Sequence, residues 1–115
     1  MQTTAQLLKA LSEEVRLRIL GLLCDGELCV CDLMAVLDLP QSTISRHLAY
    51  LKNAGWVEGE RRGAWMYYRL TEKKDGFHEG LLELLAAHLP KTKEGAADTI
   101  QLASFLGQKD KDVCG

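Results

Sequence analysis

The sequence lacks an excess of basic residues, a long apolar segment and a secretory leader. The net charge of its 115 residues is −2 at pH 7, so binding to nucleic acid would require basic residues gathered on one face. No apolar run approaches the ~20 residues of a membrane span, and the first residues have neither the basic nor the apolar part of a secretory signal. We therefore expect a cytoplasmic protein with no membrane partner, whose four cysteines are mostly reduced.

The length and composition fit one globular domain followed by an extension. Hydrophobic residues make up 47% of the chain and charged residues 26%, as in ordinary soluble proteins. The strong apolar pattern ends at Pro90. We expect one folded domain over residues 1–90 and an extension over 91–115, with a short helix over 96–106 and a mobile tail from Gly107.

The first quarter of the chain has the apolar spacing of two helices. The first covers residues 4–10. Ser12 stands before two glutamates, and a hydroxyl followed by acids is a typical helix start, so Ser12 is expected to cap the second helix. That helix should end near the flexible pair Asp25-Gly26.

Two more helices follow, joined by a tight turn. The third begins inside the motif "ELCVCDL" (27–33), where apolar residues start to recur at helical spacing. Pro40 disfavours a helical conformation of the residue before it, so the chain turns there. The fourth helix runs from about Ser42 to Asn53, with Gly55 just past its end.

The second half of the chain changes period. The stretch "WVEGERRGAWMYYRL" (56–70) is rich in aromatic and branched residues around a turn-like centre, which predicts a β-hairpin. The leucine-rich segment 77–89 predicts a helix with a wide apolar side, suited to a partner surface. Two helices joined by a tight turn and followed by a hairpin indicate a mostly α, winged helix-turn-helix fold, in which the fourth helix would enter a DNA major groove.

The outward face of the fourth helix has the side chains that could contact DNA. At 100° per residue, Ile44, Leu48 and Leu51 share one side, and small hydroxyl groups and one arginine lie opposite. Two arginines at the hairpin tip would lie near the adjacent phosphates, whereas His47 is expected to pack. The candidate DNA-binding residues are Gln41, Ser42, Thr43, Ser45, Arg46, Tyr50, Arg61 and Arg62.

Cys29 and Cys31 are the candidate thiol site, and three interpretations are open: small core residues, a redox pair, or ligands of a soft ion. Side chains two apart point the same way on a strand but about 200° apart on a helix. A shared ion would therefore require an extended or unwound first turn of the third helix. The C-x-C spacing and the absence of a βαβ pattern argue against a thiol oxidoreductase.

Three stretches together resemble the ArsR/SmtB family of bacterial repressors, in its arsenic-responsive branch: "ELCVCDL", "LPQSTISRHLAYLKNAGWV" and "RRGAWMYYRL". The resemblance covers roughly residues 5–89. It implies a non-enzymatic homodimer, formed through its first and last helices, that blocks transcription of a resistance operon. It also implies that As(III) or Sb(III), bound by cysteine thiolates, is the inducer that releases the operator DNA.

The inferred ligand set is incomplete, because As(III) takes three thiolates. Well-known arsenic repressors have a third cysteine where this chain has Met34, which lies on the apolar stripe of its helix and cannot supply a thiolate. Besides Cys29 and Cys31, the third ligand is then Cys24, Cys114 or an exogenous thiol. Cys24 is favoured over Cys114, because closing a short loop costs less entropy than ordering a tail.

Other functions of the same residues remain as alternatives. A repressor of the same fold could sense Cd(II), Pb(II) or thiol oxidation through these cysteines, and four thiolates would suit Cd(II). A metal carrier that never touches DNA would leave the fourth helix and its hairpin unexplained. The primary expectation is a repressor of an arsenic-resistance operon.

Overall fold

The computed structural model describes residues 2–109. Within them six α-helices, one 3-10 helix and three strands follow in order: α1 (Gln2–Ala10), α2 (Glu14–Leu23), β1 (Leu28–Cys29), α3 (Val30–Leu37), α4 (Gln41–Ala54), β2 (Val57–Arg62), β3 (Trp65–Leu70), α5 (Gly76–His88), η1 (Leu89–Lys91) and α6 (Lys93–Lys109). Among residues 2–109 there is no helix with the length and apolar character needed to span a membrane.

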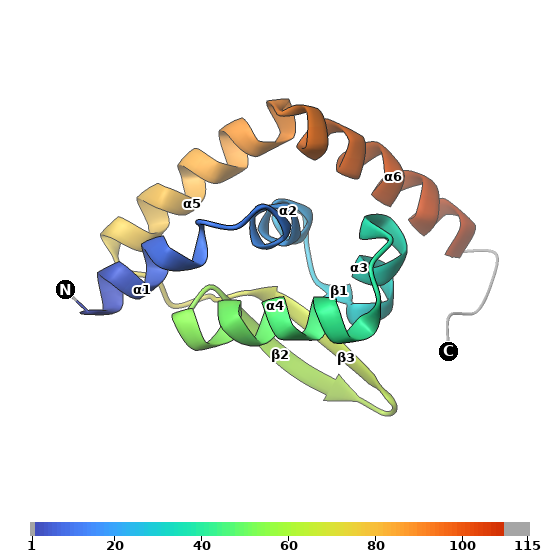
Figure 1. The fold of residues 1–115 in the computed structure, drawn as a ribbon, viewed down its shortest axis with the longest axis horizontal. Coiled ribbons are helices and arrows are strands. Elements are labelled where there is room, and N and C mark those ends of the chain that lie inside the picture. Colours follow the sequence, from blue (N-terminus) through green and yellow to red (C-terminus); the bar gives the residue numbers. More distant parts are fainter. Residues whose placement is uncertain (1, 110–115) are drawn as a thin grey trace.

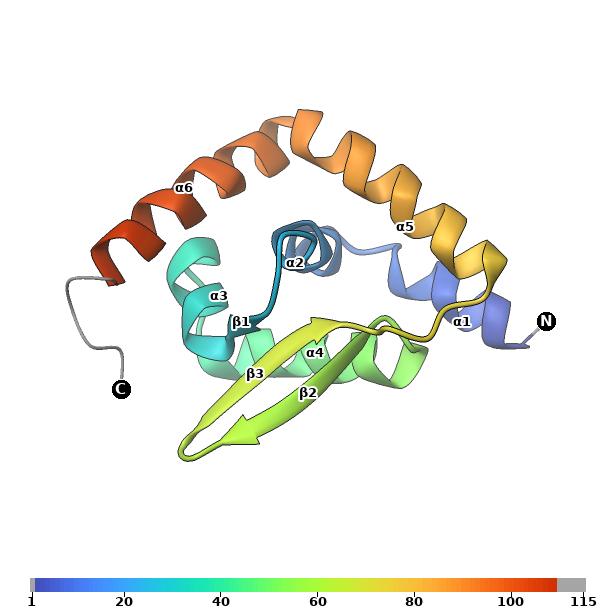
Figure 2. The same cartoon turned by 180° about the vertical axis from the view of Figure 1, so that it is seen from behind.

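Helices α2, α3 and α4 surround the core, and the other elements enclose this unit from two sides. Helices α5 and α6 form an arch over α2, while the β2–β3 hairpin extends from the side of α4 (Figure 1). The reverse view shows α6 beside α3 and the short β1 against the hairpin (Figure 2). The largest fully buried side chains are Trp56, Ile19, Leu20, Leu23, Leu33, Ile44, Leu48 and Leu51.

The α3–turn–α4 unit confirms the expected helix-turn-helix. Asp38 ends α3 in the left-handed conformation, at φ 55°, and its amide donates to the Met34 carbonyl. Pro40 then occupies the N-cap of α4. Gly55 ends α4 at φ 95°, a conformation that glycine adopts without the steric penalty of a side chain. Helix α4 extends one residue beyond the expected segment at each end.

The start of α2 differs from the expectation. Ser12 is not the cap: its hydroxyl donates to the Lys9 carbonyl at 2.7 Å and so closes the end of α1. Glu13 caps α2 instead, since its carboxylate accepts from the Arg16 amide at 3.0 Å. The prediction was wrong by one residue because the turn after α1 also needs a polar partner, and Ser12 supplies it.

The sheet has three strands rather than the two of a simple hairpin. Its order is β1-β3-β2, with both pairs antiparallel, so the hairpin strand β3 lies in the centre. In β1, Leu28 pairs with Tyr68 and Cys29 pairs with Tyr67. The cysteine motif is therefore hydrogen-bonded directly to the β2–β3 hairpin, the wing of the fold. The sequence did not predict this pairing, because β1 has only two residues.

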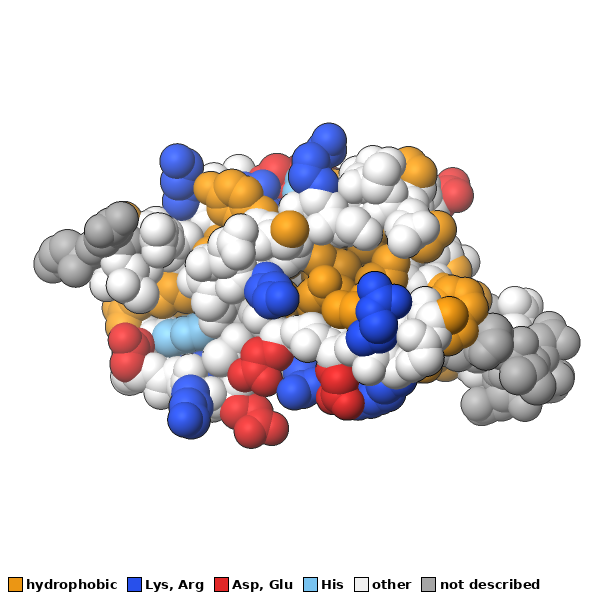
Figure 3. Space-filling model, turned by 90° about the horizontal axis from the view of Figure 1, so that it is seen from below, with side chains coloured by type: hydrophobic (Ala, Val, Ile, Leu, Met, Phe, Trp, Pro, Cys, Tyr) orange, Lys and Arg blue, Asp and Glu red, His pale blue; other side chains and the backbone are white. Residues whose placement is uncertain are grey.

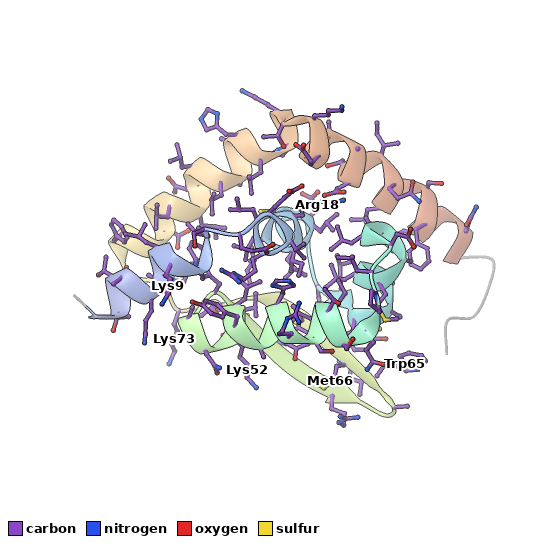
Figure 4. The ribbon with its side chains drawn as sticks, in the orientation of Figure 1. Lys9, Arg18, Lys52, Trp65, Met66 and Lys73 are labelled. Carbon is purple, nitrogen blue, oxygen red and sulfur yellow. The ribbon has the colours of Figure 1, made fainter. Side chains whose placement is uncertain are left out.

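The C-terminal extension forms a longer helix than expected and packs on the rest of the chain. Helix α6 covers the predicted 96–106 segment and continues to Lys109, so residues 107–109, expected in a mobile tail, are helical. Residues 110–115 lie outside the described part. Arg18 of α2 points toward α6 (Figure 4) and makes a two-point ion pair with the buried Asp98. Arg18 Nε donates to Asp98 Oδ2 at 2.9 Å, and Arg18 Nη2 donates to Asp98 Oδ1 at 2.8 Å.

A substitution in α6 tests whether this helix stabilises the domain. Leu102 is 9% exposed and belongs to the common core, so Leu102→Ala should lower the free energy of unfolding by about 2–3 kcal/mol. Ile100, which is 71% exposed on the same helix, is the matched control, and Ile100→Ala should change it by less than about 0.5 kcal/mol. Urea unfolding followed by circular dichroism at one protein concentration measures both. Equal effects would mean that α6 does not pack as described.

Candidate DNA interface and thiol site

Helix α4 presents a small polar face opposite the core. Ile44, Leu48 and Leu51 are fully buried on the inner side. On the outer side, Lys52 points away from α2, toward the side of the hairpin (Figure 4). The predicted contact residues Gln41, Ser42, Ser45 and Arg46 are exposed, and Thr43 is half-buried. The structure thus gathers these side chains on one accessible face, and their contact with DNA stays a prediction.

The surface that includes α4 and the hairpin carries both signs of charge. Lysine and arginine side chains are spread over it, with aspartate and glutamate among them along one edge (Figure 3). Lys9 of α1 and Lys73 before α5 also point to this side (Figure 4). Neither lysine was among the predicted contacts, because the two come from separate elements and no sequence motif groups them.

Tyr50 takes part in packing as well as in the outer face of α4. The Arg16 guanidinium lies 4.1 Å from the centre of the Tyr50 ring, and its Nε donates to the Ala10 carbonyl at 2.8 Å. The tyrosine is 39% exposed, so part of its side chain remains available. His47 is half-buried with Nδ1 3.6 Å from Glu13, and burial lowers the pKa of His47, which fits the expected packing role.

The two hairpin arginines have different surroundings. Arg61 is exposed and lies near the turn at Gly63, and its contact with a phosphate stays a prediction. Arg62 is bound by Glu27, at 2.5 Å and 2.9 Å, and by Glu60, at 3.3 Å. Hydrogen bonds to these two carboxylates raise the pKa of Arg62, and the bond to Glu27 has the larger effect. The two arginines look alike in the sequence, because only the folded chain places Glu27 opposite Arg62.

Cys29 and Cys31 converge at the junction of β1 and α3. Cys29 has extended backbone angles, φ −74° and ψ 152°, and forms the N-cap of α3. Its Sγ accepts from the Cys31 amide at 3.3 Å, and the Asp32 carboxylate accepts from the Cys29 amide at 2.7 Å. The two Sγ atoms lie 2.7 Å apart. The motif is therefore not wholly helical, and its two sulfurs lie side by side, as the hypothesis of a shared ion requires.

The other candidate ligands do not join this pair within the described residues. The Cys24 thiol donates to the Leu20 carbonyl at 3.3 Å, and burial, together with Asp25, raises the pKa of Cys24. Cys114 lies outside the described residues. Met34 packs against the core, as expected. Among residues 2–109 no three histidine, cysteine or acidic side chains are arranged to hold a metal ion.

Comparison with known proteins gives the family. Residues 13–58 match the model of the arsR family of bacterial regulatory proteins. The chain is 44% identical, over 99% of both proteins, to the arsenic resistance transcriptional regulator ArsR2 of Pseudomonas putida. It is 51% identical to the arsenical resistance operon repressor of Escherichia coli, over 57% of each chain.

A solved structure agrees with the fold. The homodimeric winged helix-turn-helix DNA-binding domain Mb0332 of Mycobacterium bovis matches this chain with a TM-score of 0.63 and 26% identity, over 99% of this chain and 89% of that one. The match to the family model, the full-length relative and the winged helix-turn-helix described above lead to one conclusion. The chain belongs to the ArsR family of bacterial transcriptional regulators.

Proposed function

We propose that this protein is a homodimeric repressor of an arsenic-resistance operon, which leaves its operator when As(III) or Sb(III) binds Cys29 and Cys31. The observation that carries the proposal is the convergence of the two sulfurs, 2.7 Å apart, at the start of the helix-turn-helix. The arsenic-resistance regulators of P. putida and E. coli support this choice of inducer.

The chemistry of the two cysteines suits a thiophilic ion. Thiolates are soft ligands, and the two thiols that would supply them lie in direct contact, with Cys31 donating to Cys29. A third thiolate from Cys24, Cys114 or a small-molecule thiol would complete the set that As(III) prefers. The ion itself supplies strong bonds to sulfur, and the protein supplies the orientation of its thiols.

Cys29 is placed to transmit a change at the thiols to the DNA-binding elements. It is the N-cap of α3, which is followed by α4, and it is also the ladder partner of Tyr67 in the wing. Any movement of its backbone or Sγ therefore affects the helix-turn-helix and the hairpin together. For induction, the ion must bind the free conformation more tightly than the DNA-bound one.

A dimer gives each operator two reading helices. Residues 2–109 of one chain contain one helix in the DNA-reading position, α4, and Mb0332, with the same fold, is a homodimer. Leu84 of α5 is 57% exposed and Phe77 is 47% exposed, which fits a helix with a partner surface. Two copies would contact an inverted repeat, each through its own α4.

Titration of the reduced protein bound to operator DNA tests the function and its inducer. As(III) and Sb(III) should release the DNA at concentrations where Zn(II) and peroxide do not. Fluorescence anisotropy of labelled operator measures the release. If Cd(II) or Pb(II) acts instead, the metal-sensing alternative holds, and if peroxide alone acts, the protein is a sensor of thiol oxidation.

X-ray absorption of the As(III)-bound protein tests the third ligand. The Cys24 bond to Leu20 and the raised pKa of its thiol oppose the advantage of its short tether, so we expect Cys24→Ser to keep three As–S bonds. The variant Cys114→Ser then identifies the third ligand. If Cys114 is that ligand, the variant loses one As–S bond; if an exogenous thiol is, the variant keeps all three. Loss of one sulfur in Cys24→Ser would show that Cys24 leaves Leu20 to bind the ion.

A further inference from the structure

Glu27 stands between the thiol site and the wing. It directly precedes β1, and its carboxylate makes a two-point pair with Arg62 of β2, at 2.5 Å and 2.9 Å. The side chain of Glu27 is 26% exposed and that of Arg62 is 46% exposed. Two parallel bonds between a guanidinium and a carboxylate form the geometry that arginine also uses to bind phosphate.

The surrounding charges neutralise Arg62. Glu60 accepts from Arg62 at 3.3 Å, and Arg69 of β3 contacts Glu27, Glu58 and Glu60 at 3.4, 3.3 and 3.3 Å. The cluster thus contains three carboxylates and two guanidiniums. A wing meant only to attract DNA would not need these acids, because each of them competes with phosphate for an arginine.

The same charged cluster is connected to the thiol motif in two ways. The Arg62 guanidinium lies 4.7 Å from the centre of the Tyr67 ring, and Tyr67 is the ladder partner of Cys29. Glu27 is also only two residues before Cys29 in the chain. A shift of β1 therefore moves Glu27 relative to Arg62.

We propose that Glu27 is a positioning residue that competes with DNA phosphate for Arg62, so that the position of β1 sets how strongly the wing binds DNA. This proposal deepens the proposed function and depends on it, since it requires that the wing contacts operator DNA. Arg62 is then a conditional phosphate contact, and Arg61, exposed beside it, is a permanent one. Movement of β1 on inducer binding would strengthen or weaken the competition.

Salt-dependent DNA binding by the full-length protein tests this role. Releasing Arg62 adds about one phosphate contact in each subunit, so Glu27→Gln should tighten binding about 3- to 10-fold per subunit at low salt. For the dimer it should steepen the slope of log K against log [salt] by about 1.8. The gain should be similar on operator and unrelated DNA. Glu58→Gln is the matched control: it removes the same charge from the neighbouring strand β2, where Glu58 contacts Arg69 and the Glu72 amide, and it should leave the slope unchanged.

A double variant decides whether Arg62 carries the effect. In the Arg62→Gln background, Glu27→Gln should give no further gain in affinity and no change in slope. The proposal is overturned if Glu27→Gln leaves the slope unchanged, weakens binding, or tightens it equally without Arg62. These outcomes are separate from failure of the proposed function, which would appear as a wild-type protein that does not bind operator or does not respond to As(III).

Discussion

Cys29→Ser and Cys31→Ser should each remain bound to the operator at As(III) concentrations that release the wild-type protein. Serine keeps the approximate shape but has no thiolate, so the ion loses an essential ligand. Serine is also a good helix N-cap, so Cys29→Ser should retain the start of α3. For the wild-type protein we expect As(III) to lower DNA affinity about 5- to 150-fold, the usual range of allosteric coupling, and for the variants almost no change.

Operator anisotropy with and without As(III) measures this coupling, and circular dichroism checks the fold. Met34→Leu is the matched control, because it changes a sulfur-containing side chain of the same helix that packs against the core. It should respond like the wild-type protein. An As(III) response that survives in the double variant Cys29→Ser, Cys31→Ser would overturn the assignment of the thiol site.

Arg46→Ala should abolish the preference for operator over unrelated DNA. Arg46 is exposed on the outer face of α4, where its guanidinium can bind a base edge or phosphate at two points. Loss of such a contact with a base costs about 1–3 kcal/mol of discrimination per site, and a dimer loses two. Competition binding with operator and scrambled DNA at one salt concentration measures the ratio.

Two further variants show whether Arg46 is a specific contact. Lys52→Ala removes one positive charge from the same helix and should weaken binding to both DNAs equally. Arg46→Lys keeps the charge but loses the planar fork, and should lose most of the preference. Sedimentation should show the same dimer for all of them. An unchanged operator preference in Arg46→Ala would mean that another face of α4 reads the DNA.

The helix-turn-helix could be predicted from sequence because its signals are local. Pro40 and Gly55 fix the ends of α4 through their own backbone preferences, and the spacing of Ile44, Leu48 and Leu51 shows which side is buried. The same holds for the hairpin, whose turn and strands are adjacent. Such features need no knowledge of the rest of the molecule.

The parts that were missed depend on contacts between distant segments. Strand β1 exists only because Leu28 and Cys29 meet β3, and α6 continues past Gly107 while its Leu102 and Asp98 pack against the domain. Nothing in the sequence distinguishes Arg61 from Arg62 as a phosphate contact. Only the folded chain shows that Glu27 lies opposite one of them.

The different exposure of the two sulfurs has a kinetic consequence. Cys29 is 1% exposed, whereas Cys31 is half-buried. An ion arriving from solvent would therefore exchange with Cys31 first, and reach Cys29 only when the beginning of α3 opens. We expect the speed of the response to follow the frequency of that local opening, and the sensitivity at equilibrium to follow the strength of the bonds to sulfur. A substitution that loosens this turn could then make the protein respond faster without making it detect lower concentrations.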